Sequence, residues 1–131
     1  MLLLKPLLEN YIGEIKELYR TELSEEIKSV TCFGILDGEE LRAVASVKCY
    51  SGHWYLRSCI VKPEYRGQGF QKQLIRERLE YLATKTDCAR VSVYPQNVYS
   101  IKNIEAEGFE FEKTKKLKNG KTVNVYLKRL R

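Results

Sequence analysis

A glycine-rich turn between an apolar run and a helical pattern is the stretch of this sequence that could do chemistry. The apolar run stops at Val61, and Pro63 bars further strand pairing because it has no N–H group to donate. Gly67 and Gly69 follow, and a helical spacing of apolar residues begins at Phe70. A strand, a turn and a helix in this order direct free backbone N–H groups to one point. Such a point suits a phosphate, which the glycines allow close to the backbone.

The residue types around this turn are more specific than two glycines alone. They follow the pattern Val-x-Pro-x-x-Arg-Gly-x-Gly, at Val61, Pro63, Arg66, Gly67 and Gly69. The pattern resembles the coenzyme A motif of the GNAT superfamily of N-acetyltransferases, in which an Arg/Gln-x-x-Gly-x-Gly/Ala turn holds the pyrophosphate of acetyl-CoA. Here the last position of that turn is Gln71 instead of Gly or Ala. The Gln71 side chain either crowds the phosphates or donates a hydrogen bond to them.

A second stretch resembles the penultimate helix of the same family. Asn97-x-x-Ser100, followed by Gly108 and Phe109, matches an Asn-x-x-Ala…Gly-Phe pattern. Seven residues after the asparagine, many family members carry the tyrosine that protonates the leaving thiolate. Ile104 stands at this position and cannot donate a proton.

The resemblance implies a site for acetyl-CoA or CoA as co-substrate, and no metal. Main-chain groups at the end of the strand would pair with the pantetheine arm, the turn would hold the pyrophosphate, and the later helix would flank the cofactor. The implied cofactor-binding residues are Cys59, Ile60, Val61, Arg66, Gly67, Gln68, Gly69, Phe70, Gln71, Asn97, Ser100 and Asn103.

The implied reaction is transfer of an acetyl group from acetyl-CoA to a primary amine by direct attack. The amine must lose a proton, the leaving thiolate must be protonated or otherwise stabilised, and the protein must hold both reactants within reach. Tyr99 and Tyr94 are the candidate acids, with water as a further possibility. We expect a small-molecule acceptor rather than a protein amine. The alternative, motivated by Gln71 and Ile104, is a GNAT-fold CoA-binding module with little or no transferase activity.

The predicted elements follow the order β-α-α-β-β-β-α-β-α-β-β. Strands are predicted at 2–4, 30–36, 41–50, 54–61, 89–94, 109–111 and 123–127, and helices at 7–18, 21–29, 70–85 and 98–107. Hairpin turns are predicted at Asp37–Gly38, Ser51–His53 and Asn119–Gly120. Strands 54–61 and 89–94 should run parallel because a helix connects them. This order matches the GNAT fold, an α+β architecture with a mixed sheet of about seven strands and about four helices, as one domain over residues 1–131.

Composition excludes several other classes of protein. No apolar run approaches the roughly 18 residues that a membrane span needs. The apolar start at residues 1–4 has no basic region before it, so we predict no signal peptide and a cytoplasmic protein. Four cysteines without Cys-x-x-Cys spacing and the single His53 cannot form a zinc site, so we expect reduced thiols.

The net charge of +6 comes from the C-terminal segment 113–131, which holds eight Lys or Arg residues and no acid. The lysines either protect the edge of a strand hairpin or attract an acidic acceptor or the anionic cofactor. Nucleic-acid binding is the third and least favoured interpretation, because no aromatic stacking platform accompanies the charge. The resemblance leaves a homodimer open.

Overall fold

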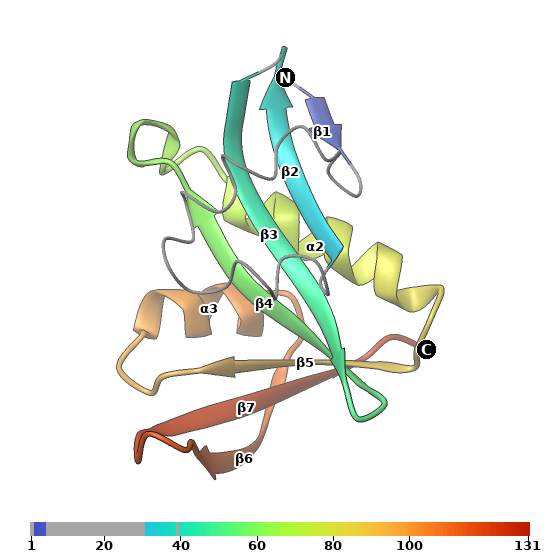
Figure 1. The fold of residues 1–131 in the computed structure, drawn as a ribbon, viewed down its shortest axis with the longest axis vertical. Helices are drawn as coiled ribbons and strands as arrows, with labels where there is room; N and C mark the ends of the chain where they lie inside the picture. Colours follow the sequence, from blue (N-terminus) through green and yellow to red (C-terminus); the bar gives the residue numbers. More distant parts are fainter. Residues whose placement is uncertain (1, 5–30, 39) are drawn as a thin grey trace.

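A single mixed sheet organises the described part of the molecule (Figure 1). The computed structural model describes residues 2–4, 31–38 and 40–131. The strands are β1 (Leu2–Leu4), β2 (Thr31–Asp37), β3 (Glu40–Tyr50), β4 (His53–Val61), β5 (Cys88–Val93), β6 (Glu110–Lys116) and β7 (Thr122–Arg129). They lie in the order β1-β2-β3-β4-β5-β7-β6, and only β4 and β5 are parallel neighbours. The predicted seven-stranded mixed sheet is therefore confirmed.

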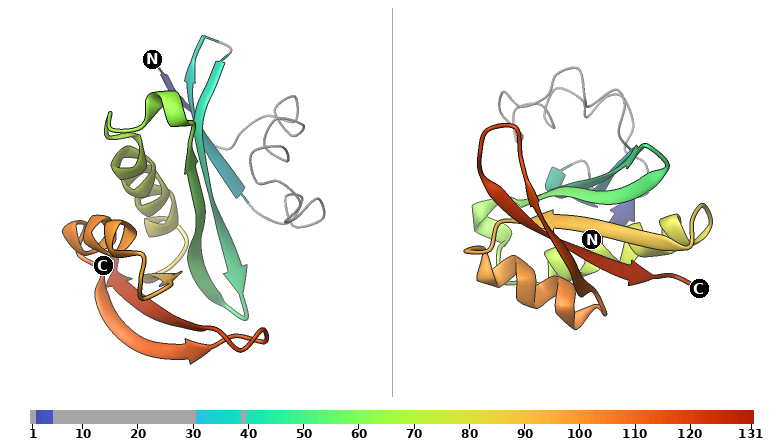
Figure 2. Two further views of the ribbon diagram at one scale, coloured as in Figure 1. Left: turned by 90° about the vertical axis from the view of Figure 1, so that its left-hand side faces the viewer. Right: turned by 90° about the horizontal axis from the view of Figure 1, so that it is seen from below.

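Two α-helices, α2 (Phe70–Ala83) and α3 (Val98–Ala106), lie in the described part of the chain, with a 3-10 turn η4 (Pro63–Tyr65) before α2. Both helices lie on the same face of the sheet (Figure 2). Of the expected helices, those at 7–18 and 21–29 fall outside the described residues, so two of about four are observed. No helix in the described ranges has the length and apolar character needed to cross a bilayer.

The core between the sheet and α2 follows from the helical spacing of apolar residues. The predicted stripe is buried, at Phe70, Leu74, Ile75, Leu79 and Leu82. It packs on side chains of the first strands, among them Phe33 of β2 and Val47 of β3. Burial of this stripe fixes α2, and with it the loop that leads into the helix, against the sheet.

The β3–β4 hairpin is tighter than predicted. His53 is the first residue of β4 and pairs with Tyr50, so the turn consists of Ser51 and Gly52 alone. These two residues have φ angles of 49° and 82°, the positive values that close a two-residue hairpin. The predicted turn is confirmed at Ser51 and Gly52 and was wrong at His53, which belongs to β4 because Ser51 adopts a positive φ and closes the hairpin in two residues.

The parallel strands β4 and β5 pair at two positions only, near the N-terminal end of β4 and in the middle of β5. The register joins Tyr55 to Arg90 and Leu56 to Val91. Beyond these pairs the strands diverge toward their C-terminal ends (Figure 1). The backbone of β4 after Leu56 therefore lacks β5 as a ladder partner, and this half of the strand leads to the glycine-rich loop.

An ion-pair cluster joins three strands at the other end of the sheet. Arg90 of β5 donates from Nε to Glu112 Oε1 (3.1 Å) and from Nη2 to Glu112 Oε2 (3.2 Å). Its Nη1 lies 3.0 Å from Nδ1 of His53 on β4. Glu112 belongs to β6 and is the extra residue where the β6–β7 register shifts. The hydrogen bond from Arg90 lowers the pKa of Glu112.

We predict that Glu112→Gln lowers the thermal stability at neutral pH, because Arg90 loses its ionised partner. A carboxylate with a lowered pKa stabilises the fold above its unfolded pKa, and the stabilisation disappears as the pH falls through the folded pKa. The difference in Tm between the wild type and the variant should therefore narrow below about pH 4. Thermal unfolding from pH 7 to pH 3 measures it, with the exposed Glu110→Gln as control. A difference in Tm that stays constant from pH 7 to pH 3 would contradict a stabilising role of the ionised Glu112.

Candidate active site

A pocket of about 480 Å³ lies where β4 ends, between the glycine-rich loop, the start of α2 and the face of α3. Nine of the twelve predicted cofactor-binding residues line it, namely Cys59, Ile60, Val61, Arg66, Gly67, Gly69, Phe70, Gln71 and Asn103. The sequence motifs, which lie up to 44 positions apart, are thus brought together in one place. The lining includes the same half of β4 that does not pair with β5.

The other three predicted residues do not line this pocket. Gln68 is exposed in the loop. Asn97 is the N-cap of α3, where its Oδ1 accepts a hydrogen bond from the backbone N–H of Ser100 (3.3 Å). This bond satisfies one of the free N–H groups at the start of α3. The conformation thus gives Asn97 and Ser100 a capping role, and their predicted role in cofactor binding remains a prediction.

Three pocket residues were absent from the predicted cofactor set: Tyr65, Lys72 and Tyr99. Lys72 lies in the first turn of α2, and its position directly after the glycines was the signal that could have identified it. Tyr65 ends η4, and its place in the pocket depends on the bend of that turn. Tyr99 was named only as a candidate acid, although it lies one helical turn from Asn103 on α3.

The glycine-rich loop takes a backbone shape that favours glycine. Gly67 and Gly69 both have φ of 81°, and Gly69 is the N-cap of α2 without a side-chain cap. A Cβ atom at either position would meet nothing within 4 Å, so positive φ, rather than crowding, sets the preference for glycine. The first N–H groups of α2 lack partners inside the helix and attract an anion.

Two cationic side chains accompany this helix N-terminus. Arg66 is exposed, and its Nε donates to the backbone oxygen of Val61 (3.2 Å), so the side chain bridges the loop to the end of β4. This bond uses one of the five N–H groups of the guanidinium. Lys72 is exposed in the first turn of α2. Together with the helix N-terminus, the two charges make this end of the pocket suitable for phosphate groups.

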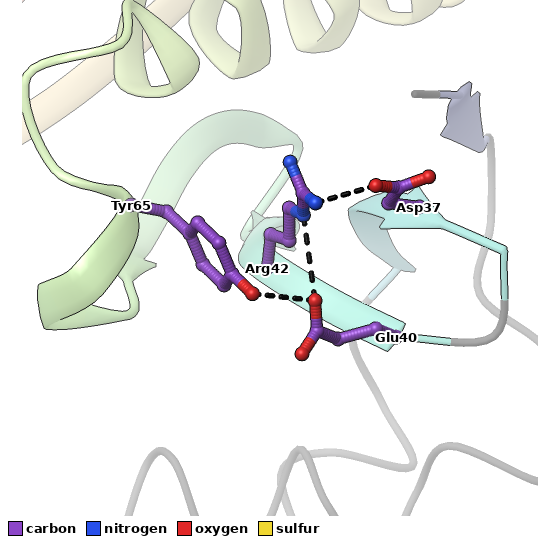
Figure 3. Close-up of polar contacts among 4 residues, drawn as sticks. All are labelled: Asp37, Glu40, Arg42 and Tyr65. Atoms are coloured by element: carbon purple, nitrogen blue, oxygen red, sulfur yellow. Dashed lines mark hydrogen bonds and ion pairs between the residues drawn. The ribbon is translucent and has the colours of Figure 1, made fainter.

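Tyr65 attaches the loop to the β2–β3 hairpin (Figure 3). Its hydroxyl donates to Glu40 Oε1, and the guanidinium carbon of Arg42 lies 4.4 Å from the centre of its ring. Arg42 also pairs with Asp37 and, at 3.5 Å from Nε to Oε1, with Glu40. The hydrogen bond to Glu40 raises the pKa of Tyr65. The loop is therefore held from the sheet side by a tyrosine, a carboxylate and a guanidinium.

Arg78 of α2 holds the backbone from the helix side. It is 3% exposed. Its Nε donates to the Leu74 carbonyl (3.1 Å), and its Nη1 donates to the carbonyls of Ser46 (3.2 Å) and Arg57 (2.9 Å). One buried guanidinium thus joins α2 to both β3 and β4. Because Gly69 and α2 are continuous, Arg78 also fixes the helix that carries the candidate anion site.

These contacts fall at an irregularity in β4. Ala45 pairs with Cys59 and Ser46 with Arg57, so Ser58 is the extra residue of a β-bulge. The bulge immediately precedes the pocket residues of β4. Burial raises the pKa of the Cys59 thiol, and the charge of Arg78 opposes this effect. Cys59 is therefore a neutral thiol near neutral pH, which agrees with a packing or backbone role rather than that of a nucleophile.

The candidate acids occupy different surroundings. Tyr99 lines the pocket and is 67% exposed. Tyr94 follows β5 outside the pocket lining, with Lys121 Nζ 5.9 Å from the centre of its ring. Ile104 is 4% exposed and belongs to the core. Asn103, beside it, has a buried Nδ2 without a hydrogen-bond partner in the described part of the chain. No group of three or more potential metal ligands occurs among the described residues.

Comparison with known proteins assigns the fold and the family. A model of the acetyltransferase (GNAT) family matches residues 4–109. The chain therefore belongs to the GNAT family of acetyltransferases, as the two sequence motifs indicated. A sequence comparison with curated proteins gives no significant match.

Solved structures of similar fold include several N-acetyltransferases. An acetyltransferase from Bacillus subtilis in complex with CoA has a TM-score of 0.83 at 15% identity, covering 98% of each chain. The ribosomal-protein-S18-alanine N-acetyltransferase from Escherichia coli has a TM-score of 0.80 at 14% identity, covering 98% of this chain and 94% of the other. A spermidine/spermine N-acetyltransferase from Vibrio cholerae has a TM-score of 0.77 at 19% identity, covering 98% and 94%. At these identities the likeness concerns the fold.

We predict that Arg78→Met destabilises the fold by about 2–4 kcal/mol, because the carbonyls that the guanidinium satisfies lose a buried donor. Arg76→Met is the matched control. Arg76 lies on the same helix with 62% of its side chain exposed, and its ion pair to Glu107 (3.0 Å) should contribute about 1 kcal/mol or less. Urea unfolding measures both variants. Equal losses of unfolding free energy in Arg78→Met and Arg76→Met would show that Arg78 does not act through its buried contacts.

Proposed function

We propose that the protein is an N-acetyltransferase that moves an acetyl group from acetyl-CoA to a primary amine by direct attack. The observation that carries the proposal is the pocket itself. A stretch of β4 without a β5 partner, a positive-φ glycine loop and a helix N-terminus line one cavity in a chain of the GNAT family. One of the similar solved structures is a CoA complex.

The described residues fit the coenzyme in their chemistry. At Cys59, Ile60 and Val61 the strand pairs with β3 but not with β5, so its edge toward β5 is open to an extended pantetheine arm, with the Val61 carbonyl already accepting from Arg66 Nε. The glycine loop, Arg66 and Lys72 offer backbone N–H groups and positive charge, as a pyrophosphate requires. When bound, the coenzyme supplies an activated thioester. The protein's contribution is to bind and orient it, and a neutral Cys59 thiol is consistent with a route without an acetylated enzyme.

The proposed acceptor is a primary amine on a small molecule. The fold is shared with a spermidine/spermine N-acetyltransferase, and also with an enzyme that acetylates a ribosomal-protein alanine. Transfer to free amines therefore has precedent in proteins of this architecture. An assay of thiol release from acetyl-CoA over a panel of small amines and peptides would separate the two acceptor classes.

We predict that the wild type binds acetyl-CoA and CoA saturably, and that Gly69→Glu weakens binding at least about tenfold, because a carboxylate then faces the phosphates. Gly52→Glu is the matched control. Gly52 has φ of 82° against 81° at Gly69, and a Cβ atom at either position would have no neighbour within 4 Å. Gly52 lies in the β3–β4 turn, away from the pocket. Calorimetric titration measures all three proteins.

Absence of wild-type binding at millimolar CoA would refute the proposal. Binding without turnover over the amine panel would instead indicate the alternative function, a CoA-binding module. Equal weakening in Gly52→Glu and Gly69→Glu would show that backbone strain, which both variants share at about 1–2 kcal/mol, explains the loss.

We predict that Tyr99→Phe and Tyr94→Phe each keep kcat within about threefold of the wild type. Tyr99 is 67% exposed, and Tyr94 lies outside the pocket lining, so neither hydroxyl is enclosed with the reacting atoms. Steady-state kinetics with a turned-over amine checks this. A fall of about a hundredfold or more in either variant would identify that tyrosine as the general acid.

A further inference from the structure

One hydrogen-bond donor in the pocket has no use within the described part of the protein. Asn103 of α3 lines the pocket, and its Nδ2 is buried without a partner in the described residues. A buried N–H group left unpaired costs about 1–3 kcal/mol, and native proteins leave few of them. A donor of this kind at a pocket wall is suited to an acceptor that arrives with a ligand.

The other polar side chains of the pocket are engaged or lie elsewhere. The Tyr65 hydroxyl and one N–H group of Arg66 already donate within the protein. Tyr99 is largely exposed. Gln71 and Lys72 lie in the first turn of α2, at the anion-binding end. Asn103 is thus the pocket side chain that carries a buried and unused donor.

The neighbours of Asn103 explain why its donor matters. Ile104, the next residue, is packed in the core and donates nothing. Cys59 lines the same pocket from β4, where burial keeps its thiol neutral. The lining of this pocket therefore includes a neutral amide and a neutral thiol.

We propose that Asn103 Nδ2 donates a hydrogen bond to the coenzyme sulfur and stabilises the leaving thiolate in place of a proton-donating residue. This inference rests on the proposed function. As the amine nitrogen forms a bond to the acetyl carbon, the C–S bond breaks and its electron pair remains on the sulfur. Asn103 keeps its own proton throughout. The proton that the amine nitrogen loses passes to solvent, and the thiolate takes a proton from solvent after the transfer.

The sulfur contact can be tested with two ligands that differ only at that atom. CoA and desulfo-CoA, in which hydrogen replaces the thiol, are titrated into the wild type, Asn103→Leu and Lys102→Gln. Leucine has the same number and branching of side-chain heavy atoms as asparagine but no polar group, and Lys102 is an exposed neighbour on the same helix. At about pH 9.5, above the ordinary thiol pKa near 8.5, Asn103→Leu should lose about tenfold or more in affinity for CoA and little for desulfo-CoA. Lys102→Gln should change neither affinity.

A spectroscopic titration gives a second readout that does not depend on turnover. The ultraviolet absorbance of the thiolate reports the pKa of the CoA thiol while CoA is bound. Because a hydrogen bond to the charged form favours that form, this pKa should be about one unit lower in the wild type than in Asn103→Leu. Retained binding of desulfo-CoA by the variant demonstrates that it is folded.

The outcomes separate this inference from the proposed function. Equal losses for CoA and desulfo-CoA would overturn it, because Asn103 would then contact another part of the coenzyme. An unchanged affinity and an unchanged thiol pKa in Asn103→Leu would overturn it as well. Failure of the wild type to bind either ligand would refute the proposed function, and this inference with it.

Discussion

The incomplete pairing of β4 with β5 is the constraint on which the rest of the site depends. The strands share the register at Tyr55 and Leu56 and then diverge, so the later half of β4 has main-chain groups without a β5 partner. In a protein interior such groups need water or a ligand, because an unpaired buried polar group is costly. The pocket lies along that half of the strand. Asn103 of α3 forms another part of the pocket wall.

The later half of β4 pairs with β3 but not with β5, and two side chains hold it from opposite directions. Arg78 reaches from α2 to carbonyls of β3 and β4 at the bulge, which fixes the strand just before the pocket residues begin. Tyr65 reaches from the loop to Glu40 on β3, which fixes the backbone just after they end. The stretch of β4 that has no β5 partner is thus held at both ends. These contacts hold the pocket edge of β4 in place and leave the pocket open. The burial of the Arg78 charge carries a desolvation cost, which its several hydrogen bonds offset.

The sequence predicted those parts of the structure that local chemistry determines. Strand ends, the parallel pairing and the glycine loop follow from periodicity, Pro63 and the two glycines, which act within a few residues. The features that the sequence did not predict depend on backbone conformation or on contacts between residues far apart in the sequence. Ser51 adopts a positive φ that its residue type does not favour, and Asn97 caps its own helix outside the pocket lining. Tyr65 lines the pocket from the 3-10 turn η4, which we did not predict from the sequence. Nor could sequence spacing tell that Asn103 Nδ2 has no hydrogen-bond partner among the described residues.

On the proposed assignment of Asn103, the leaving thiolate is stabilised by a hydrogen bond and is not protonated by the protein. Ile104 removes the titrating donor that the resemblance led us to expect, and it packs in the core. A negative thiolate at Cys59 would repel a second thiolate forming nearby, but burial raises the pKa of Cys59 and keeps it neutral. A neutral amide donor can stabilise a thiolate through a hydrogen bond, and it does not change its charge with pH. On the proposed assignment, transfer would therefore stay active at alkaline pH, where a tyrosine acid with a pKa near 10 would lose its proton.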